Sequence, residues 1–340
     1  MDNWMRSKLP PLPRRLPPVQ GETTLSYVDR LAKANHLDSR NLIGYLNPEL
    51  TGTRGLQRRF DISLDVLAAV TGIPTAHLAQ ALPEIRPQHP DLHTTGQAAA
   101  GRPNRTQPAC RRCMAAKNIQ TTVAIWAHPD HNICPRHHLW IGHGVIDPTD
   151  QVEVAQLPEI PRAQVRHRNL IRRHGRGRVE PFYEHARAVI DWSTNLPCDT
   201  GRWNRMDYFV AREQAKTASS PLRKRRLSLA RSHDYAAYYP EVIDLLSILV
   251  SPYWLRIAVS DGAAEREHFY NQVMKSGLTN GTPALNRPLQ KWIARQRDSQ
   301  PDQAPAAGDL STIANWPGCR RPLESARSRP PCRDGSDDGG

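Results

Sequence analysis

The chain has 340 residues, six of them cysteine, and a formal net charge of +13 at pH 7. This length allows two domains, or one domain with appendages. The absence of any run of about eighteen apolar residues excludes an ordinary membrane span. Six cysteines in so long a chain do not indicate a disulfide scaffold. The positive charge favours a polyanionic partner, of which DNA or RNA is the obvious kind.

The first twenty residues are basic and rich in proline, which predicts an extended lead over residues 1–20. They lack the apolar core of a signal peptide, so we expect a cytoplasmic protein without a membrane partner. From Glu22 onward, apolar residues recur at a helical period through "TTLSYVDRLAKANHL". Thr23 or Thr24 can cap the start of this helix.

The stretch "LDVLAAVTGIPTAHLAQAL" has the spacing of a helix-turn-helix, which we place at residues 60–83. Ala68 lies four residues before Gly72, and such a small pair lets two helices approach closely. Thr75 is the expected N-cap of the second helix. Because that helix carries no arginine or lysine, it fits base and phosphate contact poorly. The pair can therefore serve either DNA or a protein partner.

Four residues form two half-sites separated by twenty residues: Cys110, Cys113, Cys134 and His137. Each two-residue gap suits a tight knuckle that points both side chains into one tetrahedron. Zinc favours such a Cys3His set at a closed structural site, so the pattern predicts one structural Zn²⁺ in a ribbon over residues 108–145. His137 keeps the spacing of the first half-site, but a three-residue gap can also bind zinc, which leaves His138 as an alternative.

Asp130 and His131, just before the second half-site, resemble the Asp-His step of zinc-stapled HNH nucleases, where the histidine is the general base. No later Asn–His pair stands beside a second cysteine knuckle, so the nuclease is the less favoured hypothesis. The three other cysteines have no partner at knuckle spacing and are not expected to bind metal. They are Cys198, Cys319 and Cys332.

Residues 160–297 are predicted to form a helical C-terminal domain, followed by a disordered tail over 298–340. Its first basic run is "RHRNLIRRHGRGR", Arg166 to Arg178, in which Gly175 is expected to end a helix. Val165, Leu170 and Ile171 are expected to face a core while arginines face outward. Such runs are either solvated helix faces or phosphate-binding surfaces. The candidate nucleic-acid contacts are Arg168, Arg172, Arg173, Arg176, Arg178, Arg223, Lys224, Arg225 and Arg226. The aromatics expected in the helical core are Trp192, Trp203, Tyr208, Tyr253 and Trp254.

In their order, these features resemble the TniQ family. The segment "LPPVQGETTLSYVDRLAKAN" is similar to the family's opening, and the helix pair looks like its "LA..TG.P...L" segment. The cysteine cluster, with Trp126 and a closing "CP.H", looks like its zinc ribbon. The resemblance covers residues 10–145, within a TniQ-like domain that we place at 21–150. Arg111 stands where the family commonly has proline, and His138 where it often has glycine.

The resemblance implies a mainly α protein with an N-terminal helix-turn-helix-like region, a small Cys3His zinc ribbon and a C-terminal helical domain. It also implies a non-catalytic adaptor in DNA transposition. Such an adaptor helps select the target site by linking DNA or a targeting complex to an AAA+ transposition ATPase. A transposase or an RNA-guided complex would be further partners. A zinc-containing helix-turn-helix transcription regulator is the alternative hypothesis, and an HNH-like nuclease a more distant one.

Overall fold

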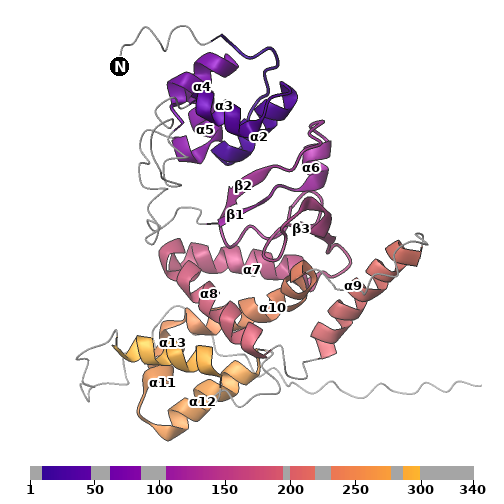
Figure 1. Ribbon diagram of the computed structural model, residues 1–340. Helices are drawn as coiled ribbons and strands as arrows, with labels where there is room; N and C mark the ends of the chain where they lie inside the picture. Colours follow the sequence, from indigo (N-terminus) through magenta and orange to yellow (C-terminus); the bar gives the residue numbers. More distant parts are fainter. Residues whose placement is uncertain are drawn as a thin grey trace, which may run out of the picture. The chain divides into compact units, whose positions relative to one another are not determined.

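The computed structural model describes residues 10–46, 62–85, 105–193, 200–218, 231–276 and 286–298. The described residues before Asp298 belong to one compact unit. Residues 299–340, which belong to the tail expected to be disordered, lie outside the described residues. The described part is mainly helical with a few short strands, which confirms the predicted fold class at this level (Figure 1).

The N-terminal region is a group of short helices around a shared apolar core. Its helices are α2 (Thr24–Ala34), α3 (Ser39–Leu46), α4 (Leu64–Thr71) and α5 (Thr75–Ala81), followed by the 3₁₀ turn η3 (Pro83–Ile85). Tyr27, Leu31 and Leu67 are fully buried in this core. As predicted, Thr23 caps α2, since its hydroxyl accepts a hydrogen bond from the Ser26 N–H.

Helices α4 and α5 occupy the stretch predicted as a helix-turn-helix and contact one another. Helix α4 ends at Gly72, whose φ of 64° lies in the left-handed region, and the Gly72 N–H donates to the Ala68 carbonyl. Pro74 takes the N-cap position of α5, so the expectation of a Thr75 cap is wrong. The restricted φ of proline suits the extended residue before the helix. A DNA-reading role for the pair stays a prediction.

The described part of the proline-rich lead runs in extended form against these helices, as expected. The Leu12 N–H donates to the Val70 carbonyl of α4 at 2.8 Å. The hydroxyl of Tyr27 donates to the Leu16 carbonyl at 2.8 Å. A proline-rich segment cannot pair its backbone N–H and C=O groups internally. Here some of these groups form hydrogen bonds to the helices instead.

A buried ion pair fixes the junction between the lead and α2. The Arg30 guanidinium lies 2.7 Å from the Glu22 carboxylate, and both side chains are buried. Further hydrogen bonds offset the desolvation of the two charges, because Glu22 also accepts from the Val19 N–H and Arg30 also donates to the Pro17 carbonyl. Glu22 and Arg30, which belong to the segment that resembles the opening of the family, therefore stabilise the fold.

Two small antiparallel hairpins form the ribbon, which we define as residues 105–154. The first pairs β1 (Arg105–Pro108) with β2 (Ala124–Ala127), and the second pairs β3 (Leu139–Trp140) with β4 (Val152–Glu153). The short helix α6 (Arg111–Ala115) follows β1. Glu22 forms an isolated bridge to Ile125 of β2, so the N-terminal region is hydrogen-bonded to the ribbon.

The helical part, which we define as residues 159–298, is built around α10. Its helices are α7 (Glu159–His174), α8 (Arg176–Ser193), α9 (Thr200–Ala218), α10 (Arg231–Leu249), α11 (Pro252–Val259), α12 (Ala263–Met274) and α13 (Arg287–Asp298). Helices α7, α8 and α9 all contact α10, which is buried along most of its length (Figure 1). Gly175 ends α7 with a φ of 81°, as predicted from the sequence.

The second hairpin of the ribbon is part of the same apolar core as α10. Trp140 is almost fully buried and packs edge-on against Tyr239 of α10, with ring centroids 5.2 Å apart. Val152 of β4 lies in the same cluster. The ribbon and the helical part are therefore joined by packing.

No single helix among the described residues is long and apolar enough to cross a membrane. Helices α10 and α11 reach the required length and composition only as a pair, and they are bent by 76° at the break between them.

Several side chains expected in the helical core lie on the surface instead. Val165 is 57% exposed, because Ala163, Gln164 and His167 take the buried positions of α7. Leu170 and Ile171 do pack against the core, as predicted. Three of the five aromatics expected in the core are exposed, and two are packed against it. The exposed ones are Trp192, Trp203 and Tyr253, and the packed ones are Tyr208 and Trp254.

Candidate metal centre

The first half-site is formed at the turn where β1 leads into α6. Cys110 is the N-cap of α6, so its carbonyl accepts from the Met114 N–H and Cys113 comes round onto the same side of the turn. Arg111, in place of the family's usual proline, has a backbone N–H that donates to the Gln151 side chain at 2.9 Å. Gln151 is fully buried and donates in turn to the Ala109 carbonyl. The hydrogen bond to Gln151 therefore uses the backbone N–H that a proline at this position would lack.

The second half-site is a tight turn just before β3. The Cys134 N–H donates to the Leu139 carbonyl, and the His138 N–H donates back to the Cys134 carbonyl, each at 2.9 Å. His138 has a φ of 48°, a left-handed conformation that glycine adopts more readily than other residues. This conformation is compatible with the glycine that the family resemblance implies at this position. The His138 side chain is exposed, while His137 is partly buried.

The structure brings the two half-sites together. One ligand atom from each of Cys110, Cys113, Cys134 and His137 lies within 4.8 Å of the others. His137 Nδ1 is 3.4 Å from Cys110 Sγ, 3.2 Å from Cys113 Sγ and 3.7 Å from Cys134 Sγ, and the Sγ atoms of Cys113 and Cys134 are 3.7 Å apart. A tetrahedral Zn²⁺ would need edges of about 3.8 Å between sulfurs and about 3.5 Å between sulfur and nitrogen. The four groups fit such an ion.

The thiols of this cluster need a cation to ionise. Burial, followed by the neighbouring thiols, raises the pKa of Cys113 to about 12. Burial likewise raises the pKa of Cys110. A divalent metal reverses this effect, since it binds thiolates and releases their protons. The arrangement is suited to hold an ion in a closed site rather than to present a metal-bound water.

One buried glutamine connects the metal cluster to the helical part. The side-chain oxygen of Gln164, in α7, accepts from the Asn132 N–H at 3.0 Å and from the Ile133 N–H at 2.7 Å. The Gln164 amide donates to the Ile133 carbonyl at 3.1 Å. These bonds fix the two residues that precede Cys134. No local pattern indicates these contacts, because a single glutamine on a helix predicts only a solvated side chain.

Asp130 and His131, the candidate nuclease residues, lie in the same loop. The Asp130 carboxylate accepts from Arg176 at 2.7 Å and lies 3.8 Å from Arg168. Burial raises the pKa of this carboxyl, but the bond to Arg176 outweighs burial and the net pKa is lowered. Burial and then Arg168 lower the pKa of His131. Asp130 therefore acts as an ion-pair partner that links the ribbon to α7 and α8.

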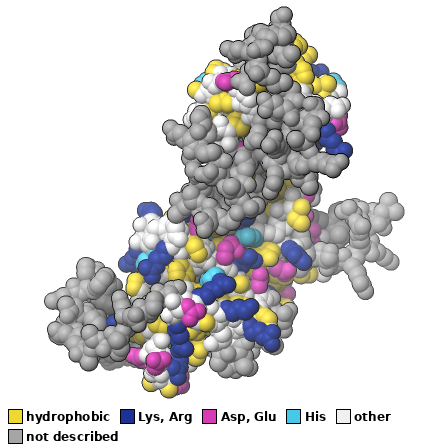
Figure 2. Space-filling model, turned by 60° about the vertical axis from the view of Figure 1, so that its left-hand side comes forward, with side chains coloured by type: hydrophobic (Ala, Val, Ile, Leu, Met, Phe, Trp, Pro, Cys, Tyr) yellow, Lys and Arg dark blue, Asp and Glu magenta, His cyan; other side chains and the backbone are white. Residues whose placement is uncertain are grey.

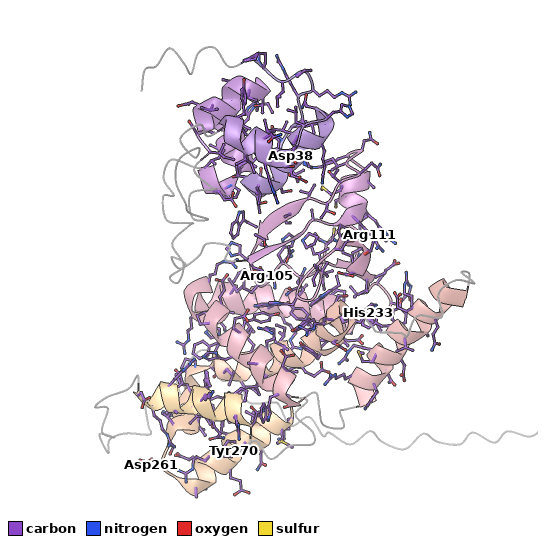
Figure 3. All side chains as sticks on the ribbon, in the orientation of Figure 1. Asp38, Arg105, Arg111, His233, Asp261 and Tyr270 are labelled. Carbon is purple, nitrogen blue, oxygen red and sulfur yellow. The ribbon has the colours of Figure 1, made fainter. Side chains whose placement is uncertain are left out.

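Arg105 is a partly buried cation that the sequence analysis did not single out. It lies at the start of β1 (Figure 3), where it donates to the side chains of Gln107 at 2.8 Å and Asn132 at 3.1 Å. Its Nε and Nη1 atoms are buried without a hydrogen-bond partner, and burial lowers its pKa. These two atoms are enclosed only because the ribbon packs against the helical part. No local pattern in the sequence therefore indicates their burial.

The basic residues predicted to contact nucleic acid have different surroundings. Arg172 and Arg173 are exposed near the end of α7, where Arg172 donates to Asn169. Arg168 and Arg176 reach the Asp130 carboxylate, and Arg178 lies over the Phe182 ring. Figure 2 shows lysine and arginine side chains on the helical part, interspersed with acidic ones. Residues 223–226 and the three other cysteines lie outside the described residues.

The TniQ family model matches residues 13–140. This chain carries a TniQ domain. The matched segment runs from the proline-rich lead through the N-terminal helices and both half-sites, and it ends in β3. The family implies a role in target selection during DNA transposition, and its members are non-catalytic. No curated protein and no solved structure matches the chain.

Proposed function

We propose that this TniQ-domain protein is a non-catalytic adaptor that links target DNA, or a targeting complex, to an AAA+ transposition ATPase. The observation that carries the proposal is the family match over residues 13–140, which contains both half-sites of the metal cluster. The ion is one structural Zn²⁺, because the donor set and its spacings suit a tetrahedral Cys3His site.

The contacts of the ribbon support a positioning role for the metal. Gln164 hydrogen-bonds the loop next to Cys134, and Asp130 in that loop pairs with Arg176 at the start of α8. The loop next to the metal cluster is therefore hydrogen-bonded to α7 and α8, and the exposed arginines lie at the end of α7. We infer that Arg172 and Arg173 contact DNA phosphates, which needs exposed cations and no particular base geometry.

Partner binding and insertion-site sequencing test the proposal together. The tagged full-length chain should retain an AAA+ ATPase when expressed in its source cells, and deleting its gene should scatter or abolish targeted insertions. Arg172→Glu/Arg173→Glu should weaken duplex binding and targeting while the ATPase is still retained. The charge-matched control Arg40→Glu/Lys275→Glu alters exposed cations on α3 and after α12 and should change neither.

Other outcomes would point elsewhere. A defined operator footprint, without any retained ATPase, would support the transcription regulator. Magnesium-dependent DNA cutting that disappears in His131→Ala would support the nuclease. Zinc is tested separately by metal analysis of the purified protein, which should give about one ion per chain, as expected for a single four-ligand site.

A further inference from the structure

Helices α8 and α13 enclose a cleft of about 400 Å³ that has no part in the metal centre or in the α7 surface. Its lining comes from both helices: His185, Ala188, Trp192, Arg287, Pro288, Lys291, Trp292 and Arg295. The volume is within the usual range for sites that bind a molecule of nucleotide size, about 300–1,000 Å³.

The charge of the cleft is positive. Arg287, Lys291 and Arg295 follow one another at intervals of four residues, so they form one stripe along α13, and all three are exposed. Successive members are about 6 Å apart along the helix axis. None of the described residues that line the cleft is acidic. Burial and then Arg295 lower the pKa of His185, as expected beside a concentration of positive charge.

The cleft also has an aromatic wall and floor. Trp192 of α8 is 46% exposed, although the sequence pattern placed it in the core. The Arg287 guanidinium lies 5.9 Å from the centre of its ring, so cation and indole form one composite surface. Trp292 is buried beneath and is stacked on Phe269. The cleft is thus lined by one exposed and one buried indole.

We propose that this cleft binds single-stranded nucleic acid, with phosphates on the α13 stripe and an unpaired base on Trp192. An exposed indole beside cations matches the two elements that non-specific single-strand binding uses, stacking and charge. A duplex hides the faces of its bases, so it can use only the charges. An acidic peptide would likewise leave Trp192 without a stacking partner. The site goes beyond the proposed function and involves none of the α7 arginines.

Fluorescence anisotropy on the full chain tests the proposal with three probes: a labelled oligo-dT of about twelve nucleotides, a duplex of the same length and a poly-glutamate peptide. Trp192→Ala should weaken oligo-dT binding about tenfold and leave duplex binding unchanged. Trp192→Tyr, which keeps a stacking ring, should restore most of the affinity. Trp203→Ala removes an exposed tryptophan from α9 and is the matched control.

The charged stripe is tested by salt dependence. Arg287→Glu/Lys291→Glu should weaken oligo-dT binding more than tenfold and lower the slope of log K against log salt by about 1.4, or about 0.7 per phosphate contact. Arg40→Glu/Lys275→Glu should leave both values unchanged.

The proposal is wrong if folded Trp192→Ala binds oligo-dT like the wild type, or if poly-glutamate competes as well as oligo-dT. These outcomes are independent of the adaptor hypothesis. If Arg172→Glu/Arg173→Glu leaves duplex binding unchanged while Trp192→Ala weakens oligo-dT binding, the α7 contacts are wrong and the cleft proposal is supported.

Discussion

The ribbon and the helical part are held together by different forces. Apart from the second hairpin, which shares the large cluster around α10, the ribbon has two small apolar clusters. One of them includes Val19 of the lead, and the other consists of Cys110 and Cys134 with Leu139 and Ile141. The ribbon's remaining order comes from hairpins, knuckles and side-chain hydrogen bonds. The helical part instead buries a large apolar cluster around α10. We therefore expect the ribbon to depend on a bound ion for its shape, while the helical part depends on burial of apolar surface.

The largest expected effect comes from the metal ligands. Cys134→Ala and His137→Ala should release the metal and unfold the ribbon, because binding at structural zinc sites is worth about 10–16 kcal/mol. The helical part should keep most of its circular dichroism signal. Metal analysis and thermal melting check both points. His138→Ala is the matched control and should keep its metal. If it loses the ion while His137→Ala retains it, the ligand assignment is reversed.

The second largest effect is expected where the ribbon packs on the helical part. Trp140→Ala should lower the free energy of unfolding by about 3–5 kcal/mol, because it empties a buried site that packs on Tyr239. Denaturant melts measure this loss. Trp203→Ala, at a site 52% exposed, should change stability by less than about 0.5 kcal/mol. Equal losses in the two variants would show that the shared core does not join the regions.

Gln164→Leu tests the polar contacts between the ribbon and α7, because it breaks them and leaves the apolar core intact. The N–H groups of Asn132 and Ile133 lose their acceptor, which should cost about 2–3 kcal/mol. Hydrogen exchange should show faster exchange at these two amides than in the wild type. Gln156→Leu, at an exposed position, should leave both amides unchanged. Unaltered exchange in Gln164→Leu would contradict the proposed link between Gln164 and the loop before Cys134.

The smallest expected effect is a pH dependence at Glu184, where the helical part meets His143 of the ribbon. Burial raises the pKa of Glu184, but His143 and Arg187 outweigh it and lower that pKa to about 2. A lowered pKa contributes stability above the usual value of 4.5, which is lost as pH falls toward about 2. Because the side chain is 42% exposed, the contribution is below about 1 kcal/mol. The stability gap to Glu184→Gln should therefore close over that range, and a gap that is constant with pH would contradict the assignment.

Local spacing in the sequence was enough for features whose partners are close along the chain. It predicted the Thr23 cap, the Gly175 helix end and the grouping of two half-sites, because caps and knuckles are settled within a few residues of backbone. The φ of 48° at His138 agrees with the glycine that the family resemblance places at this position. The family resemblance is likewise evident from the sequence, because short motifs carry it.

Only the tertiary structure decided which side chains are buried and what they pair with. Val165 and Trp192 have the character of core residues yet are exposed, while Arg105 and Gln164 are polar residues enclosed between the ribbon and the helical part. Arg176, in a basic run, pairs with Asp130 from a loop 46 residues away. Burial and pairing depend on which surfaces meet when distant segments pack, and no local pattern records that choice.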